Sequence, residues 1–308
     1  MKLYVGVTDK TWYEHVSKGG FDEVNFWKPG ASTFKALAEN EMFLFKLHSP
    51  DNFIVGGGFF VKFSILPTYM AWDAFGNKNG TNSLNELEQQ INKYRSRNNM
   101  AMVNPQIGCI ILTDPFFFER KDWIPVPNDW AGSIVAGKTY DTVTSTGKQL
   151  YEDVTAHLRL SDSASLFRED SIGSETRYSE SMTKHRLGQG AFRVLVADSY
   201  SRRCAITGEK TLPVLDAAHI KSYSEGGQNI IQNGLLLRTD IHKLFDQGYV
   251  TVDEDYRVEV SHRLHEDYGN GKIYYNYHGK PLTVMPENSF DLPDKEYLRW
   301  HNENVYLG

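Results

Sequence analysis

Hydrophobic residues in the first 150 positions form short runs separated by Gly, Pro and polar residues. Their length and their aromatic and β-branched content predict strands at 2–8, 42–48, 53–66 and 108–112. The stretch 83–95 has helical spacing instead, with Ser83 as N-cap and Glu86 completing a capping box. Many strands with one helix predict a small β-barrel with helices rather than a βαβ array.

The pattern changes after residue 150. A helix is predicted at 148–160, followed at 161–181 by a segment with seven serines in 21 residues and few apolar anchors, which is typical of a linker. Helical spacing returns near Leu187. We therefore predict an α+β protein with two domains, 1–150 and 187–308, joined by a helix and serine-rich linker at 151–186.

Composition describes an ordinary globular chain of 308 residues, 40% hydrophobic and 23% charged. The two cysteines, Cys109 and Cys204, are too few and too far apart for a disulfide framework. The N-terminus has Asp9 and Lys10 where a signal peptide needs an apolar core, and no segment has the roughly 18 apolar residues of a membrane helix. These features predict a cytoplasmic protein that does not bind membranes.

The formal net charge is −6 at pH 7. Strongly basic domains bind nucleic acid by neutralising phosphates, so the overall charge does not indicate a nucleic-acid partner. Any such binding must come from local patches, and evidence from motifs has to outweigh the global charge.

The residues with the clearest chemical pattern lie at 204–249. An apolar run at 214–220 predicts a strand that ends near His219, and a loop and a second strand at 235–237 follow. Thr239 or Asp240 then caps a helix that carries His242.

These side chains suit the hydrolysis of a phosphodiester. His242 and Asp246 stand one helical turn apart and could share a divalent cation, with Asp216 as a third ligand. His219 would remove a proton from water, and the amide of Asn233 would fix the loop that orients His219. A single histidine is more often a packed or surface residue than a catalytic one, so the order and spacing together carry the prediction.

The segments A-A-H-I, N-G-L-L-L and D-I-H-K-L-F-D-Q-G resemble the HNH (ββα-metal) endonuclease family, and the resemblance extends from about residue 187 to R-W-H-N-E-N near the C-terminus. It implies His219 as general base, Asn233 as the loop-fixing residue and His242 as a metal ligand. The chain departs from the family twice. Ala218 stands where many members carry a ligand, and Cys204 remains alone where many have two C-x-x-C knuckles, so we predict no structural zinc.

Two basic residues flank this segment, Arg238 and Lys243. They could bind the scissile or neighbouring phosphates. Exposed basic residues are more commonly just a solvated face, and that alternative stays open.

The N-terminal half is rich in aromatic residues. The triple glycine at 56–58 is no phosphate loop and is expected to let backbones approach closely or to contact a ligand. Trp27 and Trp72 lie in loop-like contexts, and with Tyr69 and Asp73 they could enclose a flipped base between aromatic rings and a carboxylate. Core packing is the alternative for each aromatic residue. The layout resembles PUA-superfamily modules of the EVE type.

Together the two halves resemble EVE–HNH modification-dependent restriction endonucleases. The resemblance implies that the chain recognises 5-modified cytosine (5-methyl or 5-hydroxymethyl) in double-stranded DNA and cuts nearby with one Mg²⁺ or Mn²⁺ per site. Cutting both strands suggests a homodimer. The alternatives are a reader of modified nucleic acid with an inactive nuclease half, and an HNH nuclease specific for unmodified DNA or RNA.

Overall fold

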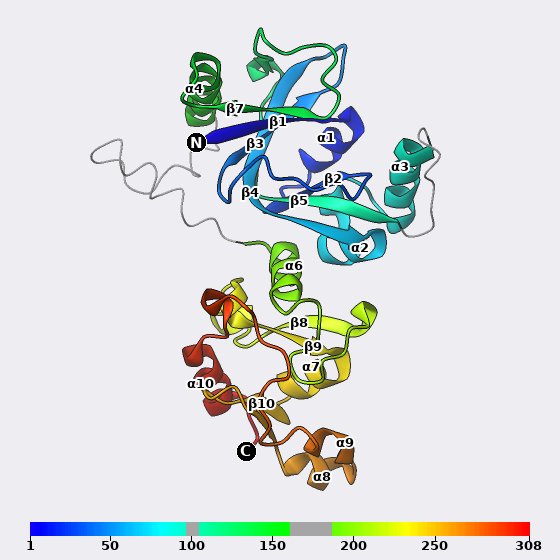
Figure 1. Cartoon of the computed structure of the whole chain (residues 1–308), viewed down its shortest axis with the longest axis vertical. Coiled ribbons are helices and arrows are strands. Elements are labelled where there is room, and N and C mark those ends of the chain that lie inside the picture. The colour runs from blue at the N-terminus through cyan, green and yellow to red at the C-terminus, as the bar shows by residue number, and fades with distance from the viewer. Residues whose placement is uncertain (97–104, 161–186) are drawn as a thin grey trace, which may run out of the picture. The chain divides into compact units, whose positions relative to one another are not determined.

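The computed structural model describes residues 1–96, 105–160 and 187–308 (Figure 1), and the predicted serine-rich linker at 161–181 lies outside them. The chain divides into two compact units, Met1–Gly188 and Gln189–Gly308. Each unit contains helices and strands, so the predicted α+β class is confirmed. Within the described residues, no helix combines the length and the apolar character needed to cross a membrane.

Unit 1 is built on one curved sheet in which β2 and β7 form the two ends. The strand order is β2-β5-β4-β3-β1-β7, with β6 beside β4. Only the β1–β3 pairing is parallel among the strand pairs of this sheet that the structure describes. The elements, in chain order, are β1 (Lys2–Thr8), α1 (Lys10–Val16), β2 (Glu23–Lys28), β3 (Met42–Leu47), β4 (Phe53–Pro67), α2 (Thr68–Phe75), η1 (Gly76–Asn79), α3 (Leu84–Ser96), β5 (Gln106–Phe117), η2 (Arg120–Asp122), β6 (Ile124–Pro125), β7 (Gly137–Asp141) and α4 (Ser145–Leu160).

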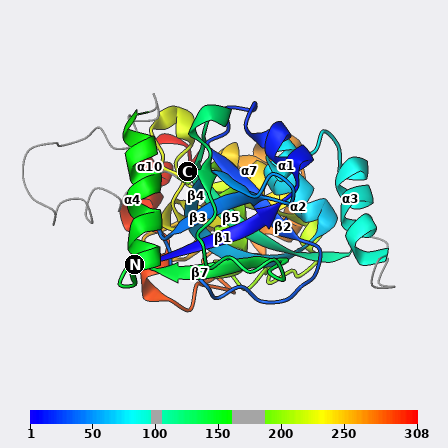
Figure 2. The same ribbon diagram turned by 90° about the horizontal axis from the view of Figure 1, so that it is seen from above.

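The sheet of unit 1 is buried on both faces. All six residues of β3 are buried, because alternate side chains enter two separate apolar clusters. Met42 and Leu44 pack with α4, whereas Phe43 and Phe45 pack with Trp12 of α1. Figure 2 shows α4 beside the strands on one side of unit 1, with α1 and α3 on the other. A sheet held between two apolar layers has little freedom to slip in register.

The triple glycine lies in β4, where it allows neighbouring strands to approach. A Cβ atom on Gly56 would lie 2.2 Å from the carbonyl oxygen of Phe116, and one on Gly57 would lie 2.6 Å from that of Phe43. Larger residues would push β4 away from β5 and β3. Of the two expected roles, the structure supports the close approach of backbones.

Three segments differ from the sequence-based expectation. The stretch around Trp27 is strand β2 and the stretch around Trp72 is helix α2, where we expected loops. Strand β2 contains two polar residues, Glu23 and Asn25. Both are buried and paired, with Lys78 and Asn79 respectively. Helix α4, which the sequence grouped largely with the linker, contributes three residues to the core of unit 1: Leu150, Val154 and Leu158.

Unit 2 contains two short antiparallel strand pairs, β8–β9 and β10–β11, packed with helices around one apolar cluster. Helix α6 contacts both β8 and β9, and α7 follows β9 directly. The elements are α6 (Gln189–Ser199), η4 (Leu212–Val214), β8 (Leu215–His219), η5 (Tyr223–Glu225), η6 (Ile231–Asn233), β9 (Gly234–Arg238), α7 (Thr239–Asp246), β10 (Val250–Val252), β11 (Val258–Val260), α8 (Arg263–Tyr268), α9 (Lys272–Tyr275), η7 (Ser289–Asp291) and α10 (Lys295–Asn304). The sequence predicted the strand–loop–strand–helix order correctly.

A buried histidine of α10 connects this helix to α7. His301 Nε2 donates to the carbonyl oxygen of Phe245 at 3.1 Å, and Nδ1 lies 2.8 Å from the hydroxyl of Thr251. The imidazole also stacks on the Phe245 ring, with centroids 3.8 Å apart. Burial lowers the pKa of His301 to about 4, because a charged imidazole would lose its hydration here.

This histidine should make the stability of the protein depend on pH. An unfolded chain takes up a proton on His301 near the usual pKa of about 6.5, whereas the folded chain resists until about pH 4. Stability from this source is therefore full above pH 6.5 and is lost as the pH falls toward 4. Between pH 7 and pH 5 we expect a loss of roughly 2 kcal/mol in the free energy of unfolding, measured by urea denaturation.

The matched control is His301→Gln, whose amide can keep both hydrogen bonds but does not titrate. The wild-type chain should lose more stability between pH 7 and pH 5 than this variant does. Equal losses in the two proteins would show that His301 is not the group responsible.

Candidate functional site

Pairing of β8 with β9 fixes where His219 stands. The two strands are antiparallel, with His219 opposite Gly234 at the end of β8. A Cβ atom on Gly234 would lie 2.4 Å from Val196 of α6, so only glycine lets α6 pack this closely. The helix thereby brings Phe192 against the His219 ring, stacked with centroids 3.9 Å apart and planes 9° from parallel.

The imidazole of His219 is held in a defined orientation, and its surroundings disfavour the charged form. Its Nε2 atom lies 2.9 Å from Oδ1 of Asn229, which is a hydrogen-bond acceptor. Burial lowers the pKa of His219, and His242 lowers it further, while Asn229 and Asp246 oppose the shift. A neutral ring that donates through Nε2 keeps its lone pair on Nδ1, which is the form that a general base needs.

Asn233 closes the loop that carries Asn229. Its side chain is fully buried and makes three hydrogen bonds to backbone. Oδ1 accepts from the amide of Lys221 at 2.8 Å, and Nδ2 donates to the carbonyl oxygens of Lys221 and Gln228, each at 2.9 Å. The two ends of the loop are thus bound to one side chain, and Asn229 follows directly after Gln228.

The second group of the site centres on His242 of α7. Nδ1 of His242 lies 3.5 Å from Oδ2 of Asp216, and Nε2 lies 3.4 Å from Oδ2 of Asp246. Asp216 is on β8, which α7 packs against. Burial raises the pKa of Asp246, opposed by His242 and His219. The structure therefore brings together all four acid–base residues that the sequence singled out, while Ala218 is buried in the core.

Of the three expected metal ligands, His242 and Asp246 are placed to bind one divalent cation together, and Asp216 is not. Two ligands about 2.1 Å from one ion lie roughly 3.0–3.4 Å apart, which matches the distance from His242 Nε2 to Asp246. Asp216 faces the other ring nitrogen, which points away from that position. The described residues contain no cluster of three or more His, Cys, Asp or Glu side chains placed to hold a metal.

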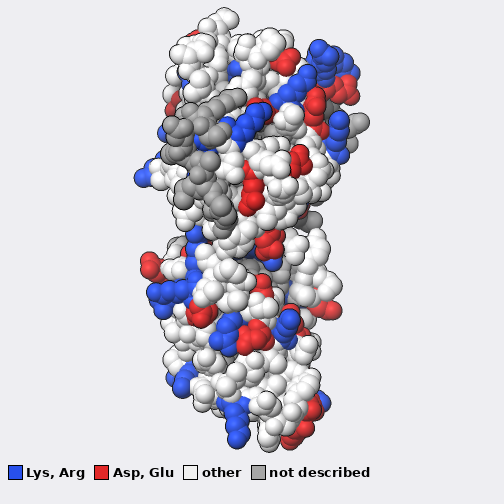
Figure 3. Space-filling view, turned by 90° about the vertical axis from the view of Figure 1, so that its right-hand side faces the viewer, with Lys and Arg blue, Asp and Glu red and all other residues white. Residues whose placement is uncertain are grey.

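The two basic residues that flank the site differ in their surroundings. Arg238 makes two bonds to Asp240, from Nε at 2.6 Å and from Nη2 at 2.8 Å, and this pair holds the pKa of Asp240 below its usual value. Lys243 is exposed on α7. On the face shown in Figure 3, basic and acidic side chains are interspersed over each unit, in keeping with the modest net charge.

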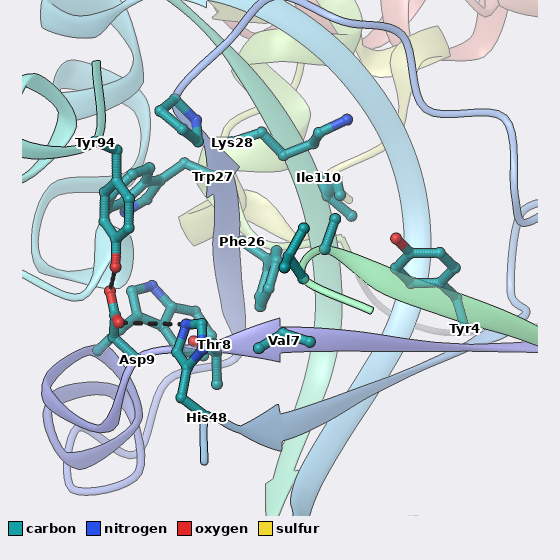
Figure 4. Close-up of a pocket in the computed structure, with 14 residues that line it drawn as sticks. Tyr4, Val7, Thr8, Asp9, Phe26, Trp27, Lys28, His48, Tyr94 and Ile110 are labelled. Atoms are coloured by element: carbon teal, nitrogen blue, oxygen red, sulfur yellow. Dashed lines mark hydrogen bonds and ion pairs between the residues drawn. The ribbon is translucent and has the colours of Figure 1, made fainter. Parts of the chain in front are cut away.

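A separate pocket of about 260 Å³ lies in unit 1 (Figure 4). Trp27 and Tyr94 form one wall, with ring centroids 6.1 Å apart and planes 67° from parallel, and Tyr4 stands on the opposite side. The Tyr94 hydroxyl donates to the carboxylate of Asp9, which also lies 3.6 Å from Nε2 of His48. Aromatic faces and a carboxylate are thus combined in one concave site.

The four residues that the sequence grouped into a base pocket do not all line this pocket. Only Trp27 lines this pocket, whereas Tyr69, Trp72 and Asp73 lie on α2 and are not among its lining residues. The carboxylate of this pocket belongs to Asp9, which follows β1, and the second aromatic ring of the wall belongs to Tyr94 of α3. Sequence reasoning missed Asp9 and Tyr94 because they stand 85 positions apart, and it missed Asn229 and Phe192 because no local pattern marks either contact.

Comparisons with known proteins assign the C-terminal site to a class. The model of the HNH endonuclease family matches residues 204–253, which include β8, β9 and α7, so the predicted resemblance to this family is confirmed for this segment. A comparison with curated protein sequences finds no significant match.

Solved structures show weaker likenesses. The ASCH protein of Zymomonas mobilis is 10% identical, with a TM-score of 0.35, over 50% of this chain and 94% of that chain. A point mutant of the same protein is 10% identical, with a TM-score of 0.33, over 50% of this chain and 99% of that one. The modification-dependent TagI restriction endonuclease is 13% identical, with a TM-score of 0.30, over 98% of this chain and 81% of that one.

Asn233 should be needed to keep the loop at 221–228 ordered. In an Asn233→Ala variant three backbone groups lose their partners, and we expect a loss of about 2–3 kcal/mol in the free energy of unfolding. Hydrogen exchange of the amides in this loop should accelerate. Asn304→Ala, which removes one exposed hydrogen bond, is the control and should change stability by less than about 0.5 kcal/mol. Equal effects of the two variants would contradict the role assigned to Asn233.

Proposed function

We propose that this chain is a metal-dependent endonuclease that recognises 5-modified cytosine in double-stranded DNA through unit 1 and hydrolyses a phosphodiester with unit 2. The observation that carries the proposal is the neutral, oriented His219 beside His242 and Asp246, inside a segment of the HNH endonuclease type. The pocket of unit 1 supports the choice of substrate, and the EVE-type resemblance suggested it from the sequence.

In the proposed mechanism the chain's own residues hold and move protons. His219 accepts a proton from water at Nδ1, while Asn229 and the Phe192 ring keep the imidazole from turning. His242 and Asp246 would hold a Mg²⁺ or Mn²⁺ ion, and Asp216 would orient the His242 ring through Nδ1 rather than ligate the ion. When bound, a divalent cation supplies positive charge that stabilises the transition state of phosphodiester hydrolysis.

Phosphate contacts would come first from Lys243, because it is exposed on the helix that carries His242. Arg238 is already paired with Asp240 and could bind a phosphate only by exchanging that partner. This division assigns the two basic residues different roles, although the sequence placed them together.

The pocket of unit 1 suits a single base. Its volume of about 260 Å³ is below the 300–1,000 Å³ of pockets that take drug-sized ligands. A base extruded from the duplex could stack on Trp27, and the carboxylate of Asp9 could accept a hydrogen bond from an exocyclic amine such as that of cytosine. Trp27, Tyr94, Asp9 and His48 therefore replace the base pocket expected from the sequence.

The nuclease assignment can be tested with three otherwise identical DNA duplexes that carry cytosine, 5-methylcytosine or 5-hydroxymethylcytosine, with Mg²⁺ or Mn²⁺ present. We expect the modified duplexes to be cut faster, and His219→Ala to lower the rate by roughly 10²–10⁴-fold. His262→Ala is the control, because His262 is an exposed histidine of unit 2 whose side chain has only Glu266 as a partner among the contacts described.

Each contrary outcome points to a different function. Equal cutting of all three duplexes would indicate a nuclease for unmodified DNA, and binding of modified DNA without cutting would indicate a reader with an inactive nuclease half. Undiminished cutting by His219→Ala would reject the active-site assignment. With a circular DNA that carries the modified base, the ratio of nicked to linear product tests the expected homodimer, because two protomers acting together yield linear DNA directly.

The base pocket can be tested with two tryptophans of the same unit. Trp27→Ala should reduce the preference for modified over unmodified DNA at least about fivefold, because stacking of one base on an aromatic ring contributes about 1–3 kcal/mol. Trp72→Ala, on α2 outside the pocket, should leave the preference unchanged. Binding is measured by fluorescence anisotropy in EDTA. A larger effect of Trp72→Ala than of Trp27→Ala would indicate that the base binds at α2 and not in this pocket.

A further inference from the structure

One exposed hydrophobic residue stands at the rim of the unit 1 pocket. Val135 is 80% exposed and is at the same time one of the residues that line the pocket. It belongs to the connection between β6 and β7, whose residues 131–133 are also exposed. Single exposed valines are common on protein surfaces, so exposure alone assigns no role to Val135. Its position beside the pocket is what distinguishes it from another exposed valine, Val143, which is 85% exposed and does not line the pocket.

The backbone beside Val135 is tied to the pocket wall. The carbonyl oxygen of Ala136 accepts a hydrogen bond from the amide of Val7 at 3.0 Å, and Val7 also lines the pocket. The next residue is Gly137, where a Cβ atom would lie 2.5 Å from the hydroxyl oxygen of Tyr4. This contact lets β7 begin directly against β1. Val135 therefore projects from a fixed part of the rim.

Extraction of a base from a duplex leaves a gap between its neighbours. The base pairs on either side lose stacking, which costs a few kcal/mol per step, and proteins that bend or open DNA often fill such gaps with apolar side chains. Valine has no polar atoms that would need hydrogen bonds inside the stack, and its branched side chain is stiff. An apolar residue fixed at the mouth of a base-sized pocket is placed to enter the gap that the extracted base leaves.

We propose that Val135 enters the DNA duplex and occupies the space vacated by the base that unit 1 extracts. The inference rests on the proposed function, because it requires that the pocket takes a base from double-stranded DNA. In this role Val135 favours extraction of the base without contacting it. Val135 therefore lowers the free-energy cost of opening the duplex and does not change how the base fits the pocket.

The test compares Val135→Ala with Val143→Ala in the full-length chain, with binding measured in EDTA by fluorescence anisotropy. One substrate is a duplex that carries 5-methylcytosine paired with guanine, and the second is a single strand that carries the same base, which needs no extraction and leaves no gap in a duplex. Val135→Ala should weaken binding of the duplex about tenfold, because truncation removes apolar surface that would be buried in the gap. Binding of the single strand should change less than about twofold, and Val143→Ala should affect neither.

Three results would overturn the inference. Val135→Ala could bind the duplex as tightly as the wild type, it could lose the same factor on the duplex and on the single strand, or Val143→Ala could match it. If the wild-type chain prefers modified DNA in such a case, the proposed function stands and only the inference fails. If the wild type does not prefer the methylated duplex over an unmethylated one, the proposed function and the inference fail together. Thermal unfolding of both variants should match the wild type, since both side chains are exposed.

Discussion

The geometry of the candidate site in unit 2 depends on the side-chain amide of Asn233. Three hydrogen bonds to Lys221 and Gln228 close a loop that would otherwise have exposed, mobile ends. Because Asn229 follows Gln228, the same closure places the acceptor that orients His219. The amide is fully buried, so each of its bonds is shielded from competing water and an unmade bond would be costly. The general-base role proposed for His219 therefore rests on Asn233, which holds the loop and not the imidazole itself.

The pocket of unit 1 is assembled from segments that lie far apart in the sequence. Tyr4, Asp9, Trp27, His48 and Tyr94 come from β1, β2, α3 and the ends of two strands. Only a rigid sheet can hold such residues in register, and the burial of β3 on both faces supplies that rigidity. The close approach of strands at Gly56 and Gly57 contributes to the same frame. In both units, residues of the core decide the geometry of residues that meet solvent.

Local sequence patterns predicted the parts of this protein that depend on local rules. The ββα order of unit 2, the capping of α3 by Ser83 and the positions of His219, Asn233 and His242 all follow from spacing along one short segment. The role of Asp216 was harder to predict, because alternation along a strand gives its face but not which nitrogen of His242 it meets. The pairing of Arg238 with Asp240 is a contact between near neighbours that competes with phosphate binding, and a motif does not reveal such competition.

The proposed base pocket shows the limit more clearly. Trp72 and Asp73 have side chains of a suitable kind, but they lie on α2 and do not line the pocket that Trp27 lines. The partners of Trp27 are set by how α3 and the end of β1 pack on the sheet, and these contacts join residues more than 60 positions apart. Composition can indicate that aromatic residues and carboxylates are available. Which of them meet depends on the tertiary fold.

Chemical rescue tests the role of His219 most directly. A His219→Gly variant lacks the imidazole and should cut DNA carrying 5-methylcytosine far more slowly than the wild type. Imidazole added to the buffer should restore part of the rate, because it can occupy the space beside Phe192 and accept the proton. His262→Gly, assayed in parallel, should show neither the loss nor the rescue. Cutting by His219→Gly at the wild-type rate, or a loss that imidazole leaves unchanged in a folded variant, would contradict the assignment of His219 as the general base.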